Sequence, residues 1–289
     1  MVFVRRPYII FVPYFGGASA GIRVLRLLAE HLSAAGEVAH AFTPKMRDGE
    51  HIFYDQPKFS DLVDAGAIVV YPEGDSGNIC DAEVVVRYVL NTPRYRDGRT
   101  DYDPDELVFS YNDLIAPRIA PGRCLGVLTV PSIETELFHA PTDGLERVLT
   151  SFYVGKGCYQ PGYVDPMNYH TVEITHYPPY PFTRPELAQL LRRSKVLYCF
   201  DMFTGMIHEA ALCGCPVVLV QAPDSPWTLE QISQGALGMG GVTVDNTPSG
   251  IALAASQCYL TAKRYALLRS GYAAQLQDFI RITQAARPL

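Results

Sequence analysis

The sequence has no uninterrupted apolar run of the roughly 18–20 residues that a membrane-spanning helix requires. It also has no excess of basic residues, because 24 Lys and Arg residues are outnumbered by 30 Asp and Glu residues. The net charge of −6 gives no basic field that would hold nucleic acid or anionic lipid non-specifically. We therefore expect a cytoplasmic protein that binds no nucleic acid and makes at most peripheral contact with membranes.

Motifs for metals and disulfides are also missing. The seven cysteines include no CxxC pair, and the seven histidines form no HxxH or HExxH motif. An odd number of cysteines, mostly flanked by apolar residues, is typical of buried free thiols in a reducing compartment. A D-x-D triplet at 101–103 lies in a charged loop and is interpreted as a solvated turn. The sequence thus predicts no bound metal and no cofactor.

The chain does contain an alternation of strand-like and helix-like segments. In the first half, short and continuously apolar runs are typical of parallel strands that are buried on both faces. These strands are expected at residues 8–15, 67–71, 106–111 and 124–130. Apolar residues at helical spacing predict a helix over 22–36, and a second helix is expected over 81–91 with Asp81 as its N-cap.

A second alternating series follows a polar, proline-containing stretch at 131–144. Its strands are expected at 148–154, 171–177, 196–200 and 216–220. Its helices are expected at 184–194, at 205–213 and from 250 to 287. Two successive βαβ series predict an α/β protein with two Rossmann-like domains, over residues 1–140 and 141–270, that face each other across a cleft. Ligands of such folds bind outside the carboxyl ends of the strands.

The segment CFDMFTGMIHEAALCGCPVVLV, residues 199–220, places polar residues inside an otherwise apolar strand–helix–strand unit. The helix that begins at Gly205 has first amides without intrahelical partners, and these amides, with the helix dipole, favour a bound phosphate. Thr204 could add a hydroxyl donor or could simply cap the helix. Glu209, one turn further in, could accept hydrogen bonds from two ribose hydroxyls, or it could be an ordinary solvated helix residue.

This segment resembles the donor-site motif of GT-B glycosyltransferases, in which an acidic residue, seven others and a glutamate precede a C-G-x-P-V turn. Asp201 and Glu209 match the two acidic positions, with aspartate in place of the more usual first glutamate. Three weaker patches are similar to the interdomain stretch, the opening of the nucleotide-binding domain and the acceptor-side loop of that family. They are PSIETELFHAP (131–141), FYVGKG (152–157) and YFGGASAG (14–21). Together the patches are scattered over most of the chain.

The resemblance implies a GT-B fold in which residues 1–140 form the acceptor-side domain and 141–270 bind the nucleotide sugar. Residues 271–289 are then expected to form a helix that returns toward the N-terminal domain. The activity implied is transfer of a sugar from a nucleotide-sugar donor to a hydroxyl of a saccharide or glycolipid, in the synthesis of a surface polysaccharide. The nucleotide sugar is a co-substrate, so no separate cofactor is implied.

The resemblance also implies roles for individual residues. Glu209 would hold the ribose of the donor, and Asp201 would face the transferred sugar. Lys156 would neutralise the leaving phosphate, where a cation stabilises the charge that grows in the transition state. The diphosphate would be bound by Thr204, Gly205 and Met206, and the acceptor-side loop would contain Gly16, Gly17 and Ser19. Because aspartate replaces the first glutamate, retention or inversion of configuration is left open.

A second cluster, YPEGDSGN at 71–78, has Glu73 and Asp75 in a glycine-rich loop after a buried strand. An inverting transferase needs a general base for the acceptor hydroxyl, and a carboxylate here is well placed. Glu73 is preferred, because it directly follows the strand, where position is best defined. Alternatively, the segment is a turn in which Asp75 and Asn78 bond to the local backbone.

Two other hypotheses for the whole chain stay open. One is a nucleotide-sugar epimerase of the same fold, which would need carboxylates and histidines from both domains. The other is a non-catalytic module that binds a nucleotide or a sugar.

Overall fold

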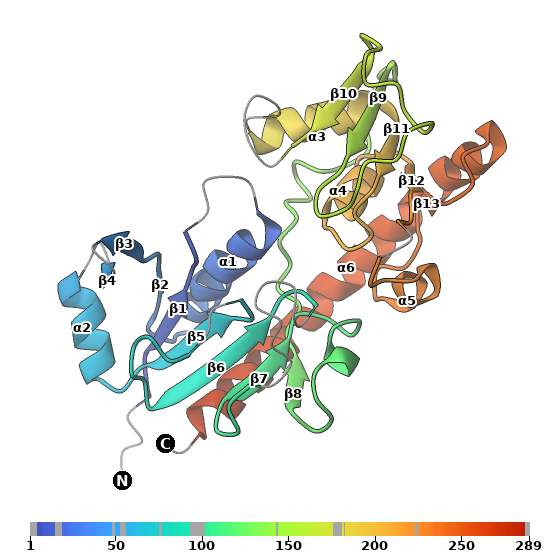
Figure 1. Cartoon of the computed structure of the whole chain (residues 1–289). Helices are drawn as coiled ribbons and strands as arrows, with labels where there is room; N and C mark the ends of the chain where they lie inside the picture. Colours follow the sequence, from blue (N-terminus) through green and yellow to red (C-terminus); the bar gives the residue numbers. More distant parts are fainter. Residues whose placement is uncertain are drawn as a thin grey trace. The chain divides into compact units, whose positions relative to one another are not determined.

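The computed structural model describes residues 5–14, 19–47, 50–52, 56–74, 77–92, 102–142, 144–175, 181, 183–222 and 225–286. The chain is an α/β protein that divides into two compact units, each with its own parallel sheet (Figure 1). Unit 1 contains Met1–Phe15, Ser19–Ser132 and Arg269–Leu289, and unit 2 is built on Ile133–Leu268.

Unit 1 has a six-stranded sheet in the order β2-β1-β5-β6-β7-β8, with all neighbouring strands parallel. The strands are β1 (Tyr8–Phe11), β2 (Ala39–Phe42), β5 (Ile68–Pro72), β6 (Val84–Val89), β7 (Leu107–Ser110) and β8 (Cys124–Val127). A separate antiparallel pair is formed by β3 (Lys45–Arg47) and β4 (Glu50–Ile52). The remaining elements before Ser132 are α1 (Ala20–Ala34), α2 (Gln56–Asp64) and a 3₁₀ turn, η1 (Ala116–Arg118).

Both faces of this sheet are buried, which explains the continuous apolar runs of its strands. Residues Val24, Leu25, Leu28 and Leu32 of α1 pack with Ile10 and Val70 on one face. Phe59 and Leu62 of α2 pack with Ile9 and Phe11 on the other face. Alternate residues of one strand thus supply two separate core clusters.

The predicted helix over 81–91 is wrong, because Val84–Val89 form the central strand β6. Val84, Val86 and Tyr88 point into the cluster that contains α1, whereas Val85 points into the cluster that contains α2. A run of β-branched residues suits this pleated and doubly buried position better than a helix. Asp81 is not an N-cap, since it precedes a strand and has a positive φ of 48°.

Unit 2 has a five-stranded parallel sheet in the order β10-β9-β11-β12-β13. Its strands are β9 (Leu149–Tyr153), β10 (Thr171–Ile174), β11 (Ser194–Cys199), β12 (Val217–Leu219) and β13 (Val242–Thr243). Its shorter helices are α3 (Arg184–Arg193), α4 (Met206–Leu212) and α5 (Leu229–Gln234). The strands and helices predicted for this part of the chain are confirmed over the described residues, with slightly shifted ends, whereas residues 176, 177 and 287 of the predicted elements lie outside the described part. The elements α5 and β13 were not predicted.

Each sheet has one point at which the strand order reverses. In unit 2, β9 comes first in the chain, β10 is added on one side of it and β11 on the other. In unit 1, β2 and β5 flank β1 in the same way. Ligands of open α/β sheets bind at the carboxyl ends of the strands beside such a switch point. The two places where a ligand site is expected are therefore the ends of β9 and β11 and the ends of β1 and β5.

The helix α6 (Pro248–Gln284) belongs to both units, because the division between them falls at Leu268 and Arg269. Its last part is built into the core of unit 1, through Tyr272, Leu276, Phe279 and Ile280. Gln284 also forms two hydrogen bonds with the backbone of Arg6, of 2.9 Å and 3.1 Å, just before β1. Among the described helices, even this one of 37 residues has no stretch apolar enough to cross a membrane.

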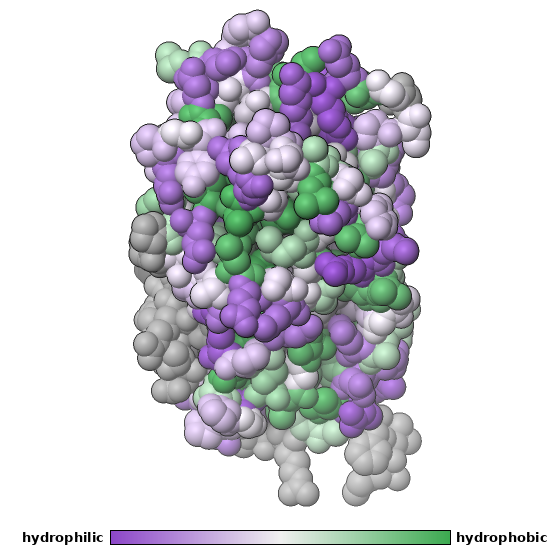
Figure 2. All heavy atoms as spheres, turned by 90° about the vertical axis from the view of Figure 1, so that its right-hand side faces the viewer, coloured by the Kyte–Doolittle hydropathy of each residue, from purple (hydrophilic) through white to green (hydrophobic). Residues whose placement is uncertain are grey.

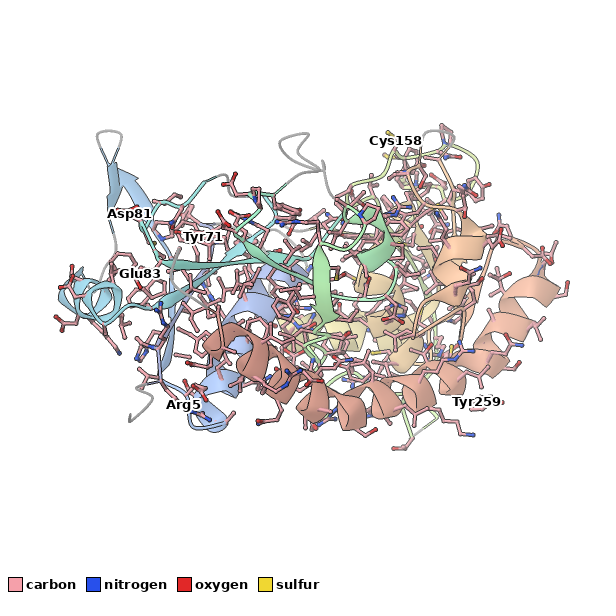
Figure 3. All side chains as sticks on the ribbon, turned by 90° about the horizontal axis from the view of Figure 1, so that it is seen from below. Arg5, Tyr71, Asp81, Glu83, Cys158 and Tyr259 are labelled. Atoms are coloured by element: carbon pink, nitrogen blue, oxygen red, sulfur yellow. The ribbon has the colours of Figure 1, made fainter. Side chains whose placement is uncertain are left out.

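The surface mixes polar and apolar residues. On the face drawn in Figure 2, green apolar patches are separated by purple polar side chains. All seven cysteines are free, and Cys158, labelled in Figure 3, is exposed. The prediction of buried free thiols is therefore confirmed for most of the cysteines and wrong for Cys158.

Candidate functional site

The loops that follow β9 and β11 meet at the switch point of unit 2. The backbone N–H of Lys156 donates to Oδ2 of Asp201 at 3.1 Å. The ammonium Nζ of Lys156 lies 3.7 Å from the same oxygen and donates to the carbonyl of Phe203 at 3.0 Å. Two residues that were predicted separately as donor-binding thus lie together, one from each loop.

Two glycines make this close approach of the loops possible. Gly155 has a φ of 57°, and a Cβ there would lie 2.5 Å from the ring of Tyr153. A Cβ on Gly157 would lie only 1.8 Å from the carbonyl oxygen of Phe200. Since backbone atoms cannot move aside as a flexible side chain can, the GKG sequence is a steric requirement of this loop.

We predict that Gly157→Ala destabilises the protein by about 3 kcal/mol, the upper part of the usual range for overpacking. Thermal denaturation measures the effect. Gly271→Ala is the matched control, because Gly271 lies inside α6 with no atom within 4 Å of the added Cβ. Alanine there should stabilise the helix by about 0.5–1 kcal/mol. Melting temperatures unchanged by Gly157→Ala would show that the two loops do not pack in this way.

Asp201 shapes the second loop. Its side chain is buried, and Oδ1 accepts a hydrogen bond from the N–H of Phe203 at 3.0 Å, while Oδ2 accepts from Lys156. Phe203 in turn stacks on Trp227, with ring centroids 4.3 Å apart and an interplanar angle of 11°. Trp227 is the only tryptophan of the chain, so its fluorescence reports on this loop.

The hydroxyl of Tyr153, at the end of β9, lies near both acidic residues of the motif, Asp201 and Glu209. Its buried hydroxyl forms a hydrogen bond with the side chain of Thr204. Burial raises the pKa of Tyr153 strongly, and the negative charges of Asp201 and Glu209 raise it further. One hydroxyl therefore lies within electrostatic range of both carboxylates. Tyr153 was not predicted as a site residue, because a tyrosine that ends a strand has no distinctive local pattern.

The start of α4 lies where the sequence predicted it. Gly205 is the N-cap residue and makes no side-chain capping bond, and Met206 is the first helical residue. The N–H of Met206 donates to Oγ1 of Thr204 at 3.3 Å. Thr204, Gly205 and Met206 are thus adjacent to the Lys156–Asp201 pair, at the same end of the sheet. His208, on the same helix, has a pKa lowered to about 4 by burial and is neutral at pH 7.

Glu209 is not a solvated helix residue, because only 2% of its surface is exposed. Its Oε1 accepts a hydrogen bond of 2.7 Å from Nη1 of Arg184, the first residue of α3. The same guanidinium pairs with Glu134 and lies over the ring of Phe138, 4.2 Å from its centroid. Burial alone would lower the pKa of Arg184, but Glu209 and Glu134 more than offset this and raise it. The predicted contact between Glu209 and a ribose stays a prediction.

The second candidate cluster lies at the carboxyl end of β5, in unit 1. Glu73 directly follows this strand, is partly buried, and accepts the N–H of Leu90 through Oε2 at 2.9 Å. Asn78 forms a local turn, since Oδ1 accepts from the N–H of Ala82 and Nδ2 donates to its carbonyl. Asp75 lies outside the described residues.

Of the three residues predicted on the acceptor-side loop, only Ser19 is described, and its side chain caps the first turn of α1 by accepting from the N–H of Ile22. Gly16 and Gly17 lie outside the described part of the chain. The structure therefore places Ser19 at the helix that follows β1, next to the switch point of unit 1.

A buried arginine lies beneath the Glu73 loop. Arg87 of β6 pairs with Glu106, and its Nη1 and Nη2 donate to the carbonyls of Pro72 and Gly77 at 3.4 Å and 3.3 Å. Its guanidinium also lies 5.2 Å from the ring centroid of Tyr71, the β5 residue labelled in Figure 3. An arginine inside the apolar run VVVRYV could have been noticed, because a buried charge needs a partner.

Comparison with known proteins adds no identification. No protein-family model matches the chain, and no curated protein is significantly similar to it in sequence. Within the described residues, no group of three or more His, Cys, Asp or Glu side chains is arranged to hold a metal ion.

Proposed function

We propose that the protein is a glycosyltransferase with a GT-B fold, which transfers a sugar from a nucleotide-sugar donor to a hydroxyl of a saccharide or glycolipid. The observation that supports this most strongly is the Lys156–Asp201 pair at the switch point of unit 2. It places a cation and a buried carboxylate where an open α/β sheet binds its ligand. The resemblance of residues 199–220 to a donor-site motif points to the same place.

In this proposal the donor diphosphate lies over the loops that follow β9 and β11. Lys156 Nζ would exchange the carbonyl of Phe203 for a phosphate oxygen of the leaving group. A cation at that position stabilises the negative charge that develops as the bond between the anomeric carbon and the phosphate oxygen breaks. Asp201 would contact the hydroxyls of the transferred sugar.

The acceptor would be bound by unit 1. Glu73 would take the proton from the acceptor hydroxyl as the oxygen attacks the anomeric carbon. The bonding electrons of the broken bond pass to the diphosphate, which leaves as a nucleoside diphosphate. Exclusion of water from the reacting atoms would favour transfer over hydrolysis.

The test is a titration with UDP, GDP, dTDP, ADP and CMP, followed by the fluorescence of Trp227 and by melting temperature. We expect one nucleotide to bind, and Lys156→Met to raise its Kd about tenfold or more, because a hydrogen bond to a charged group contributes about 1.5–3 kcal/mol. Lys195→Met is the matched control, since Lys195 is exposed in β11 close to the amino end of the strand. If no nucleotide binds, or if both variants bind equally well, the donor site is not at this switch point.

A further inference from the structure

The guanidinium of Arg184 forms ion pairs with the carboxylates of Glu209 and Glu134, which differ sharply in exposure. The side chain of Glu209 is 3% exposed, whereas that of Glu134 is 45% exposed. A buried ion pair is costly to break, because one charge would be left without compensation in the interior. An exposed pair contributes only about 0–1 kcal/mol. An incoming anion would therefore displace Glu134 from the guanidinium and leave the bond to Glu209 intact.

The contact with Glu134 has the geometry that a phosphate would use. Nη2 of Arg184 lies 2.5 Å from Oε2 of Glu134, and Nε lies 3.4 Å from Oε1. This two-pronged edge of a guanidinium binds carboxylates and phosphates alike. The other edge is held by Glu209 at 2.7 Å, and the ring of Phe138 supports the guanidinium plane. Arg184 is thus oriented without any help from Glu134.

The position of Arg184 also fits a phosphate. It begins α3, which follows β10, and β10, β9 and β11 are neighbours in the sheet. Adjacent strands are about 4.8 Å apart, so these three strand ends span roughly 10 Å. The guanidinium contacts Glu209 of α4, the helix that follows the Asp201 loop. The hydroxyl of Tyr153 lies in electrostatic range of both Asp201 and Glu209, so the Lys156–Asp201 and Arg184–Glu209 pairs are neighbours.

The charges of this cluster show how Glu134 affects the approach of an anion. Asp201, Glu209 and Glu134 carry three negative charges, whereas Lys156 and Arg184 carry two positive ones. The resulting net charge of −1 opposes the approach of an anion. Once Glu134 leaves the guanidinium, the four remaining charges balance, and one edge of Arg184 is available.

We infer that this edge of Arg184 is a phosphate-binding site, and that Glu134 is a built-in competitor which occupies the edge until a phosphate displaces it. The inference rests on the proposed function, because the phosphate would belong to the nucleotide-sugar donor. It extends that function by adding Arg184 as a second donor-binding cation and Glu134 as the residue that limits donor affinity.

The experiment is calorimetric titration of the full chain with inorganic pyrophosphate. Glu134→Gln removes the competing charge and should bind pyrophosphate roughly two- to fivefold more tightly, as expected for loss of an exposed ion pair. Glu136→Gln is the matched control, since it removes an exposed glutamate from the same segment, and its affinity should equal that of the wild type. Arg184→Lys keeps the charge that Glu209 needs but loses the two-pronged edge, so its affinity should fall about tenfold.

The double variant Arg184→Lys/Glu134→Gln tests whether Glu134 competes for this edge of Arg184. In the Arg184→Lys background, Glu134→Gln should give no further gain, because the edge for which Glu134 competes is gone. The inference is overturned if Glu134→Gln leaves the affinity unchanged, if the gain persists in the double variant, or if no variant binds pyrophosphate. Melting temperatures identify any variant that has lost its fold, and the comparison of Glu134→Gln with Glu136→Gln, both of which keep the buried Arg184–Glu209 pair, then still tests the inference.

The outcomes also separate this inference from the proposed function. If pyrophosphate shows the expected pattern but no nucleotide sugar is ever consumed, the transferase proposal fails and the anion site stands. If sugar transfer occurs and Glu134→Gln has no effect on pyrophosphate, the transferase proposal stands and the role of Glu134 is refuted.

Discussion

Replacement of Glu73 by Gln is expected to lower the rate of sugar transfer by about 10²- to 10⁴-fold, the usual contribution of a positioned general base. Glutamine is nearly isosteric and can still accept the N–H of Leu90, so the loop should keep its structure. Donor affinity should not change, because Glu73 belongs to unit 1 and the proposed donor site to unit 2. The measurement is release of nucleoside diphosphate from the nucleotide sugar, in the presence of acceptor.

The matched control is Glu83→Gln, which removes an exposed carboxylate that pairs with Arg6 at 3.2 Å near the amino end of β6. This variant should retain the activity of the wild type. Equal activity of Glu73→Gln and the wild type would remove Glu73 from the mechanism. If the wild type shows neither transfer nor donor hydrolysis with any nucleotide sugar, the alternative of a non-catalytic binding module is favoured.

Replacement of Phe279 by Ala should lower the free energy of unfolding by about 3–5 kcal/mol, as is usual for a large aromatic residue in a core. Phe279 is fully buried, and its ring centroid lies 4.8 Å from that of Phe109 and 6.2 Å from that of Tyr8. The cavity would therefore open between α6 and the strands β1 and β7. Urea denaturation followed by circular dichroism measures the effect.

Leu267→Ala, on the same helix, is the matched control, because this leucine is 71% exposed. Alanine and leucine have similar helix propensities, so the change in stability should stay within about 0.5 kcal/mol. Similar small effects of both substitutions would show that the end of α6 is not an essential part of the core of unit 1.

Much of unit 2 could be predicted from local patterns alone. The runs VLYCF and PVVLV around β11 and β12 are short and mostly apolar, and Thr183 with Glu186 forms a capping box at the start of α3. Such patterns depend on only a few neighbouring residues, and the folded protein contains the elements that they predict. The predicted helix over 81–91 failed for a related reason, because a strand buried on both faces loses its alternation of polar and apolar residues. The run around Val84–Val89 then has a length that suits either element.

The candidate site likewise combines residues that local patterns predict with contacts that only the fold creates. Asp201, Glu209, Lys156 and Glu73 were predicted because each follows an apolar strand or begins a helix within a recognisable motif. No local pattern pairs Arg184 with Glu134 or with Glu209, since 50 and 25 residues separate them in the chain. Only the packing of the start of α3 against α4 and against the segment of Phe138 brings these charges together.

The sequence by itself determined the alternation of strands and helices, the absence of a basic field, and which polar residues lie at strand ends, because these depend on composition and short-range periodicity. The tertiary structure alone decided the order of the strands, and with it the switch points at which the loops of Lys156 and Asp201 meet. It also decided that Glu209 is buried against Arg184, and that the end of α6 completes the core of unit 1. Strand order and long-range ion pairs depend on which distant surfaces bury each other, and no local pattern contains that information.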